Sequence, residues 1–187
     1  MSTIRTFIAF DTPETVRTKI ARIQSELRKV TADIRWESQD KFHVTIKFLG
    51  DMEETVLPHV IEDIEEELKG SAPFSVTYTG IGAFPNNRSP HVIWAGCKNL
   101  DGKLLEIKHT LDGCLVLRGF PIDHRTFLPH ITLGRVNSNR GLPDVQALMQ
   151  TLQLKPHNAT IREICVLKSE LHPQGSVYTL LHKIGLE

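Results

Sequence analysis

The chain carries one short pattern twice, as HVTIKFLG at residues 43–50 and as HITLGR at residues 130–135. Both segments begin His-x-Thr-hydrophobic and are rich in β-branched and apolar residues, which predicts a strand for each. Side chains on a strand alternate between its two faces, so each histidine shares a face with the threonine two residues later. The pattern therefore predicts two polar pairs held on rigid strands, His43 with Thr45 and His130 with Thr132.

The spacing of the two patterns predicts an internal repeat. From His43 to His130 the chain advances 87 residues, almost half of its 187, which divides it into residues 1–87 and 88–187. Apolar residues at intervals of three and four predict helices near residues 13–30 and 53–69, with shifted counterparts near 100–117 and 140–156. The third of these helices has an apolar stripe interrupted by one lysine: Leu104, Leu105, Lys108, Leu111 and Leu115.

Further strands are expected at residues 4–10, 74–79, 91–95, 161–166 and 176–183, the last of them entered through a turn at residues 173–175. The sequence thus predicts a single α+β domain, residues 1–187, made of two similar lobes. A pseudo-two-fold axis would relate the lobes, and each would contribute one His-x-Thr strand to a central cleft.

Composition limits the classes of function. The formal net charge is zero and the pI is about 7.1, which argues against coating long nucleic acids but allows recognition of one RNA end. Cys97, Cys114 and Cys165 lack the spacing of a metal site and are expected to be reduced thiols of a cytoplasmic protein. Since no apolar run approaches roughly 18 residues, no membrane span is expected.

Two facing imidazoles suit in-line displacement at phosphorus, because one can take a proton from the nucleophile while the other gives a proton to the leaving oxygen. Thr45 and Thr132 would donate hydrogen bonds to the non-bridging oxygens, where charge increases in the transition state. Two imidazoles and two neutral hydroxyls are a poor zinc-ligand set, so neither a metal nor another cofactor is expected.

Several segments besides the two patterns carry a family resemblance. They are RTFIAF at 5–10, RW at 35–36, FP at 84–85, VIWAG at 92–96 and FLP at 127–129, the last preceding the second pattern. With them, nearly the whole chain resembles the 2H phosphoesterases, in particular the RNA 2′,3′-cyclic phosphodiesterases, also called 2′-5′ RNA ligases. Ile46 and Gly134 depart from the commoner Leu and Ala of that family.

The resemblance implies a bilobal fold of two mainly antiparallel sheets, with helices outside and a central cleft. It implies metal-free hydrolysis of RNA 2′,3′-cyclic phosphate ends, tRNA fragments among them, to 2′-phosphates by a monomeric enzyme. Reversal of the reaction with a 5′-hydroxyl RNA would give 2′-5′ ligation. By analogy His43 would be the proton donor and His130 the proton acceptor, although the residues alone do not distinguish these roles.

Substrate contacts are expected from aromatic and basic residues near the cleft. Phe48, Phe84 and Phe127 would stack on bases, and Arg88 and Arg125 would meet flanking phosphates. Arg135 is a further candidate, but strand alternation places it on the face opposite Thr132 unless the strand bends. The alternatives are another 2H activity, on 2′-5′ oligonucleotides or small cyclic nucleotide phosphates, and a non-catalytic module that binds RNA ends.

Overall fold

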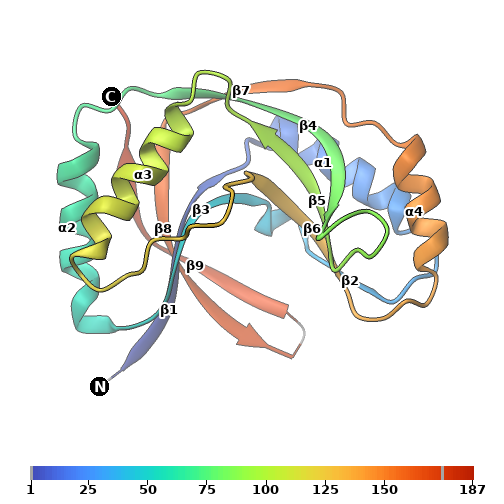
Figure 1. Ribbon diagram of the computed structural model, residues 1–187, viewed down its shortest axis with the longest axis horizontal. Helices are drawn as coiled ribbons and strands as arrows, with labels where there is room; N and C mark the ends of the chain where they lie inside the picture. Colours follow the sequence, from blue (N-terminus) through green and yellow to red (C-terminus); the bar gives the residue numbers. More distant parts are fainter. Residues whose placement is uncertain (1, 174) are drawn as a thin grey trace.

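Figure 1 shows the computed structural model of the protein, which describes residues 2–173 and 175–187. Its helices are α1 (Glu14–Leu27), α2 (Leu57–Leu68), α3 (Lys103–Val116) and α4 (Leu142–Thr151), with short 3-10 helices at Gln39–Lys41 and Glu54–Val56. Its strands are β1 (Thr3–Asp11), β2 (Ile34–Trp36), β3 (His43–Glu53), β4 (Phe74–Phe84), β5 (Val92–Lys98), β6 (His130–Val136), β7 (His157–Ile161), β8 (Glu163–His172) and β9 (Gly175–Gly185). The strand predicted at 161–166 is divided between β7 and β8, and Gln174 of the predicted turn lies outside the described residues.

The strands form two sheets. One has the order β3-β1-β8-β9 and the other the order β2-β6-β5-β4-β7, and neighbouring strands in both are antiparallel. Helices α2 and α3 lie outside the first sheet, and α1 and α4 lie outside the second (Figure 1). The predicted α+β architecture, two antiparallel sheets with helices on the outside, is confirmed. Within the described residues, no helix is both long and apolar enough to cross a membrane.

Each sheet combines strands from both halves of the chain. The four-stranded sheet joins β1 and β3 to β8 and β9, and the five-stranded sheet joins β2 and β4 to β5, β6 and β7. The helices cross over as well, because α3 follows β5 yet packs with α2 and β3, while α1 follows β1 yet packs against α4. An 87-residue shift relates the antiparallel pair β1–β3 to the pair β5–β6. The repeat itself remains a prediction, and its lobes would have to exchange elements.

Polar residues interrupt two of the apolar helix faces. Gln24 occupies a buried position of α1, 4% exposed, in line with Val16, Ile20 and Leu27. On α3 the expected stripe was wrong at one position, since Leu105 is 46% exposed. Buried instead are Leu104, Ile107, Lys108, Leu111, Asp112 and Leu115. Lys108 does not break the buried face, because Asp112 one turn later pairs with it.

Candidate active site

His43 begins β3 and is held from two sides. Its Nδ1 lies 2.7 Å from the backbone carbonyl oxygen of Lys41, two residues earlier. Its ring packs against Phe7 of β1 and Tyr178 of β9, with ring centroids 5.0 and 5.1 Å away, and those two rings also contact each other. Packing and a backbone hydrogen bond therefore fix the orientation of this imidazole.

His130 begins β6 and has the same arrangement. Its Nδ1 lies 2.7 Å from the carbonyl oxygen of Leu128, again two residues earlier, and its ring meets Phe84 edge-on with centroids 4.8 Å apart. A carbonyl oxygen only accepts hydrogen bonds, so Nδ1 of each histidine must carry a proton and donate it. In the neutral form each Nε2 is then a free base, and in the charged form it is a proton donor.

Irregular pairing gives the cleft two further side chains. In β3, Thr45 pairs with Ala9 and Lys47 pairs with Ile8, so Ile46 is an extra residue. In β6, Thr132 pairs with Trp94 and Gly134 pairs with Ile93, so Leu133 is an extra residue. Such bulges interrupt strand alternation and re-aim the side chains that follow.

The bulges bring Phe48 and Arg135, each five residues after its histidine, to the same face as the histidines. The exception allowed for Arg135, a departure from regular strand alternation, therefore applies, because the strand bulges at Leu133. Phe48 is 65% exposed, which is unusual for a phenylalanine and leaves its ring available to a ligand.

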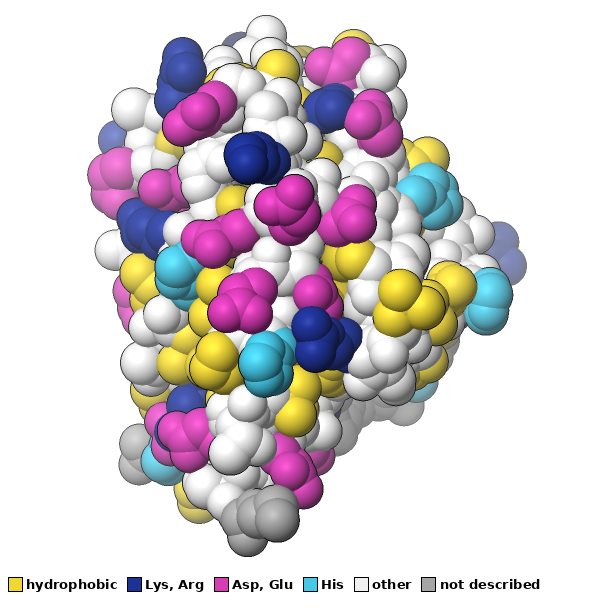
Figure 2. All heavy atoms as spheres, turned by 90° about the vertical axis from the view of Figure 1, so that its left-hand side faces the viewer, with side chains coloured by type: hydrophobic (Ala, Val, Ile, Leu, Met, Phe, Trp, Pro, Cys, Tyr) yellow, Lys and Arg dark blue, Asp and Glu magenta, His cyan; other side chains and the backbone are white. Residues whose placement is uncertain are grey.

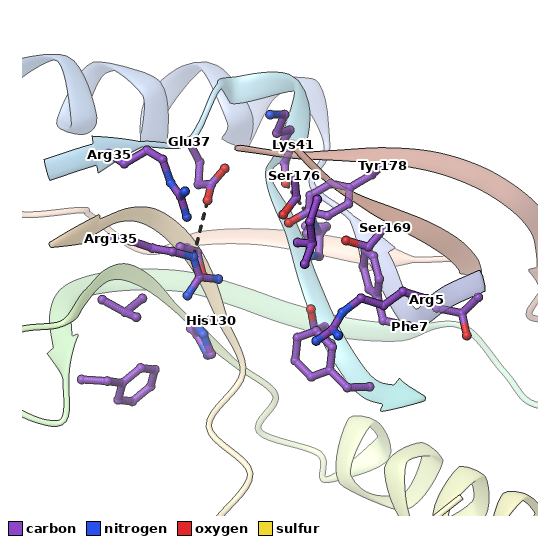
Figure 3. Close-up of a pocket in the computed structure, with 18 of the residues that line it drawn as sticks. Arg5, Phe7, Arg35, Glu37, Lys41, His130, Arg135, Ser169, Ser176 and Tyr178 are labelled. Carbon is purple, nitrogen blue, oxygen red and sulfur yellow. Dashed lines mark hydrogen bonds and ion pairs between the residues drawn. The ribbon is translucent and has the colours of Figure 1, made fainter. Parts of the chain in front are cut away.

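The two His-x-Thr strands face a common cleft of about 680 Å³. His43 and Thr45 line it from the four-stranded sheet, and His130 and Thr132 line it from the five-stranded sheet. Figure 3 shows His130 and Arg135 on one wall, facing Arg5, Phe7 and Tyr178 on the other. The four residues predicted as the chemical centre are thus brought together.

The remaining predicted contacts divide into two groups. Phe48, Phe84, Arg125 and Arg135 line the cleft. Arg88 and Phe127 are not among the residues lining the cleft: Arg88 is exposed on the loop after β4, and Phe127 packs against the core with its ring 5.8 Å from the Lys108 Nζ.

Several lining residues were not predicted as contacts, among them Arg5, Phe7, Arg35, Lys41 and Tyr178. Phe7 and Tyr178 reach the site because β1 and β9 belong to the sheet that carries β3. Strand order in a sheet is not apparent from local periodicity, so Phe7 and Tyr178 could not be predicted. Arg35 and Lys41 could have been predicted as contacts, because they lie just before the first His-x-Thr pattern.

The cleft is basic although the whole chain is neutral. Its charged lining consists of Arg5, Arg35, Lys41, Arg125 and Arg135, with Glu37 as the one carboxylate among the described lining residues. Glu37 lies 3.7 Å from the Arg135 guanidinium, a pair drawn in Figure 3. Acidic side chains gather instead on the face viewed in Figure 2, the side of the molecule where α2 lies. An anionic ligand is therefore attracted to the cleft and repelled by that outer face.

Burial sets the proton affinity of both imidazoles. It lowers the pKa of His43 below the ordinary value, outweighing the Lys41 hydrogen bond and the charge of Asp11, which raise it. Burial likewise lowers the pKa of His130; the Leu128 hydrogen bond opposes this, and the charge of Arg135 adds to it. Both rings are thus more easily deprotonated than an exposed histidine when no ligand is bound.

The donor set of the cleft is not that of a metal site. Within residues 2–173 and 175–187, no group of three histidine, cysteine, aspartate or glutamate side chains is placed to hold a metal ion. The two imidazoles can exchange protons, and the two threonine hydroxyls can donate hydrogen bonds.

This fold and this paired-histidine cleft define a phosphoesterase of the two-histidine type. A family model described as LigT like Phosphoesterase matches residues 10–94 and 96–178, and the chain belongs to that family. The predicted 2H phosphoesterase relationship is confirmed.

Named relatives cover nearly the whole chain. One from Methanothermobacter thermautotrophicus is 32% identical over 94% of this chain and 95% of its own length. Another, from Thermotoga maritima, is 31% identical over 98% of this chain and 96% of its own. Both bear the name RNA 2′,3′-cyclic phosphodiesterase.

Solved structures agree with the fold. A crystal structure of a protein from Thermus thermophilus superimposes with a TM-score of 0.81 and 26% identity, covering 98% of each chain. The Escherichia coli LigT structure with 3′-AMP superimposes with a TM-score of 0.77 and 22% identity, covering 99% of each chain, which bears on the fold alone.

Proposed function

We propose that this protein hydrolyses the 2′,3′-cyclic phosphate at an RNA end and leaves a 2′-phosphate. The main support is that two histidines, each with Nδ1 tied to a carbonyl and Nε2 free, line one basic cleft from two different sheets. The names of the two full-length relatives point to the same substrate.

The proposed reaction needs one base and one acid. Nε2 of His130 takes a proton from water, whose oxygen attacks phosphorus, and the bond from phosphorus to O3′ breaks. Nε2 of His43 gives its proton to O3′. The assignment of the two roles follows the family resemblance. The charge of Asp11 agrees with it, because it favours the charged form of His43, whereas Arg135 disfavours the charged form of both histidines.

The other lining groups suit substrate binding. Thr45 and Thr132 share a face with the histidines and would donate hydrogen bonds to the non-bridging oxygens, where charge increases in the transition state. Arg135 and Arg125 would meet flanking phosphates, and the exposed Phe48 ring would stack on a base. No step requires a metal ion, since the imidazolium and hydroxyl groups supply the positive field.

Three finer expectations accompany the proposal. Reversal of the same steps with a 5′-hydroxyl RNA as nucleophile gives 2′-5′ ligation. The physiological substrates would be RNA ends such as tRNA fragments, and the enzyme would act as a cytoplasmic monomer. These three statements rest on the family resemblance.

The test uses a short RNA that ends in a 2′,3′-cyclic phosphate, incubated with and without a chelator. We expect a 2′-phosphate product in both cases, identified by ³¹P NMR, and a loss of about 10²–10⁴ in kcat for His43→Ala and for His130→Ala. Rapid turnover by either variant would reject the two-histidine mechanism. Faster cleavage of 2′-5′ oligonucleotides or of small cyclic nucleotide phosphates would favour those activities, and tight binding without product would favour an RNA-end binding module.

A further inference from the structure

The loop between α3 and β6 carries two parts of the cleft but has little support of its own. Leu128 supplies the carbonyl that holds His130, and Arg125 lines the cleft. Among the described residues, the segment 121–128 makes no hydrogen bond from its backbone to other backbone groups. Backbone pairing resumes only at Pro129, whose carbonyl oxygen accepts from the Cys97 amide at 3.1 Å, so the loop before it depends on side-chain contacts for its position.

Three buried charges lie beneath this loop. Lys47 comes from β3, and Lys108 and Asp112 come from successive turns of α3. Their side chains are 2%, 6% and 5% exposed, and each lysine amine donates to one oxygen of the single carboxylate. We call these three residues the buried charge cluster.

The cluster contacts the loop at two points. Lys47 Nζ donates a second hydrogen bond, of 2.9 Å, to the carbonyl oxygen of Pro121 at the start of the segment. Lys108 Nζ lies 5.8 Å from the centre of the Phe127 ring, next to Leu128. An ammonium group at this distance from an aromatic ring is attracted to its face. One lysine thus fastens each end of the segment.

Stability alone does not account for the cluster. Two ammonium groups share one carboxylate, so a formal positive charge is left in the interior, where burial of charge is costly. An apolar trio of similar size would fill the space without that cost. The charges make the position of the loop more specific. A hydrogen bond and an ammonium–ring contact require a defined geometry, whereas hydrophobic packing allows the loop several positions.

We propose that Lys47, Lys108 and Asp112 are positioning residues that set the orientation of His130 through the loop. Lys47 lies between Thr45 and Phe48 on the strand that carries the other histidine, so the same cluster ties the first His-x-Thr strand to the second. The effect on catalysis rests on the function proposed above. The effect on the imidazole does not, and it is measurable without substrate.

Two matched variants remove one buried lysine each, Lys47→Met and Lys108→Met. Either change leaves one lysine paired with Asp112, so neither variant contains an unpaired buried carboxylate. Lys29→Met is the control, since Lys29 makes an exposed ion pair with Glu26 at the end of α1. The measurement is the ¹⁵N NMR spectrum of the histidine side chains across pH, on folded protein without ligand.

In the wild type we expect both cleft histidines as the Nδ1–H tautomer. In Lys47→Met and Lys108→Met we expect His130 to become a mixture of tautomers. Its pKa should also fall, because the Leu128 hydrogen bond that favours the charged form is weakened. His43 should change less than His130, because its own hydrogen-bond partner is the Lys41 carbonyl and not a group of the loop. The kcat for cyclic-phosphate RNA should fall by about 10- to 100-fold in these two variants and stay at the wild-type value in Lys29→Met.

Wild-type tautomer and pKa of His130 in both folded variants would overturn the proposal, and so would equal changes at His43 and His130. If Lys47→Met does not fold, Lys108→Met decides, since it leaves the Pro121 contact in place. If His130 responds as expected while the wild type does not cleave cyclic phosphate, the positioning role stands and the proposed function fails.

Discussion

Replacing Gln24 by methionine tests how the five-stranded sheet holds its side of the cleft. The Gln24 amide, on the buried face of α1, donates to the Glu37 carbonyl at 2.6 Å and to the Leu133 carbonyl at 2.8 Å. Leu133 is the bulge residue of β6, and its oxygen also accepts from the Glu37 amide at 2.9 Å. In Gln24→Met, whose side chain has similar length, Leu133 therefore keeps one partner and the Glu37 carbonyl loses its amide donor.

A part-buried carbonyl left without its amide donor, together with one hydrogen bond lost at the buried Leu133 carbonyl, costs about 1–3 kcal/mol. We expect the free energy of unfolding to fall by that amount, measured by urea denaturation, and Tm to fall by roughly 3–10 °C. Because Glu37 pairs with Arg135, we also expect a raised KM for cyclic-phosphate RNA with a smaller change in kcat.

A matched control lies on α4. Gln146 donates to the carbonyls of Asn87 and Arg88 at 2.8 and 3.0 Å, but these hydrogen bonds are exposed, so water replaces the amide. Gln146→Met should change the unfolding free energy by less than about 0.5 kcal/mol. If Gln24→Met and Gln146→Met have equal free energies of unfolding, burial of the Gln24 amide does not determine its contribution to stability, and the reasoning is refuted.

Three further predictions concern pH, substrate binding and packing. Burial lowers the pKa of both His43 and His130, so kcat/KM should follow a bell whose maximum lies below about pH 6.5; a maximum above pH 7.5 would contradict this. Phe48→Ala should leave Tm unchanged, because the ring is 65% exposed, yet weaken binding of cyclic-phosphate RNA by ~1–3 kcal/mol in a titration; unchanged affinity would exclude stacking. Gly82→Ala should lower the unfolding free energy by about 1–3 kcal/mol, since the added Cβ would lie within 3 Å of the Trp94 ring. Gly113→Ala, on the open surface of α3, should raise it by about 0.5–1 kcal/mol. If denaturation shows Gly82→Ala to be the more stable variant, the packing argument is refuted.

The parts of the site that the sequence predicts depend on local order along one strand. His43 and Thr45 share a face because they are two residues apart, and no other strand has to be placed to know it. The same holds for His130 and Thr132. Their meeting in one cleft was predicted from the repeated pattern, on the expectation that equivalent strands of similar lobes reach equivalent places about a two-fold axis.

The parts that the sequence does not predict depend on partners distant in the chain. The bulges at Ile46 and Leu133 are defined by the register against β1 and β5, so alternation alone misplaces Arg135. One local hint exists, because Lys47 follows the bulge residue Ile46 at a buried position and lysine is rarely a core residue. From the sequence alone, Lys108 interrupts an apolar stripe. The structure explains its burial, because Lys108 and Lys47 both donate to the Asp112 carboxylate.

The exchange of helices explains why both bulges are held by buried polar groups. The bulge of β6 belongs to the second half of the chain, and Gln24 from the first half donates to it. The bulge of β3 belongs to the first half, and Asp112 from the second half accepts from the lysine beside it. Each histidine strand is therefore fixed by a helix of the other half. A displacement of either helix would move an imidazole relative to its opposite number, so the geometry of the cleft depends on both halves being folded together.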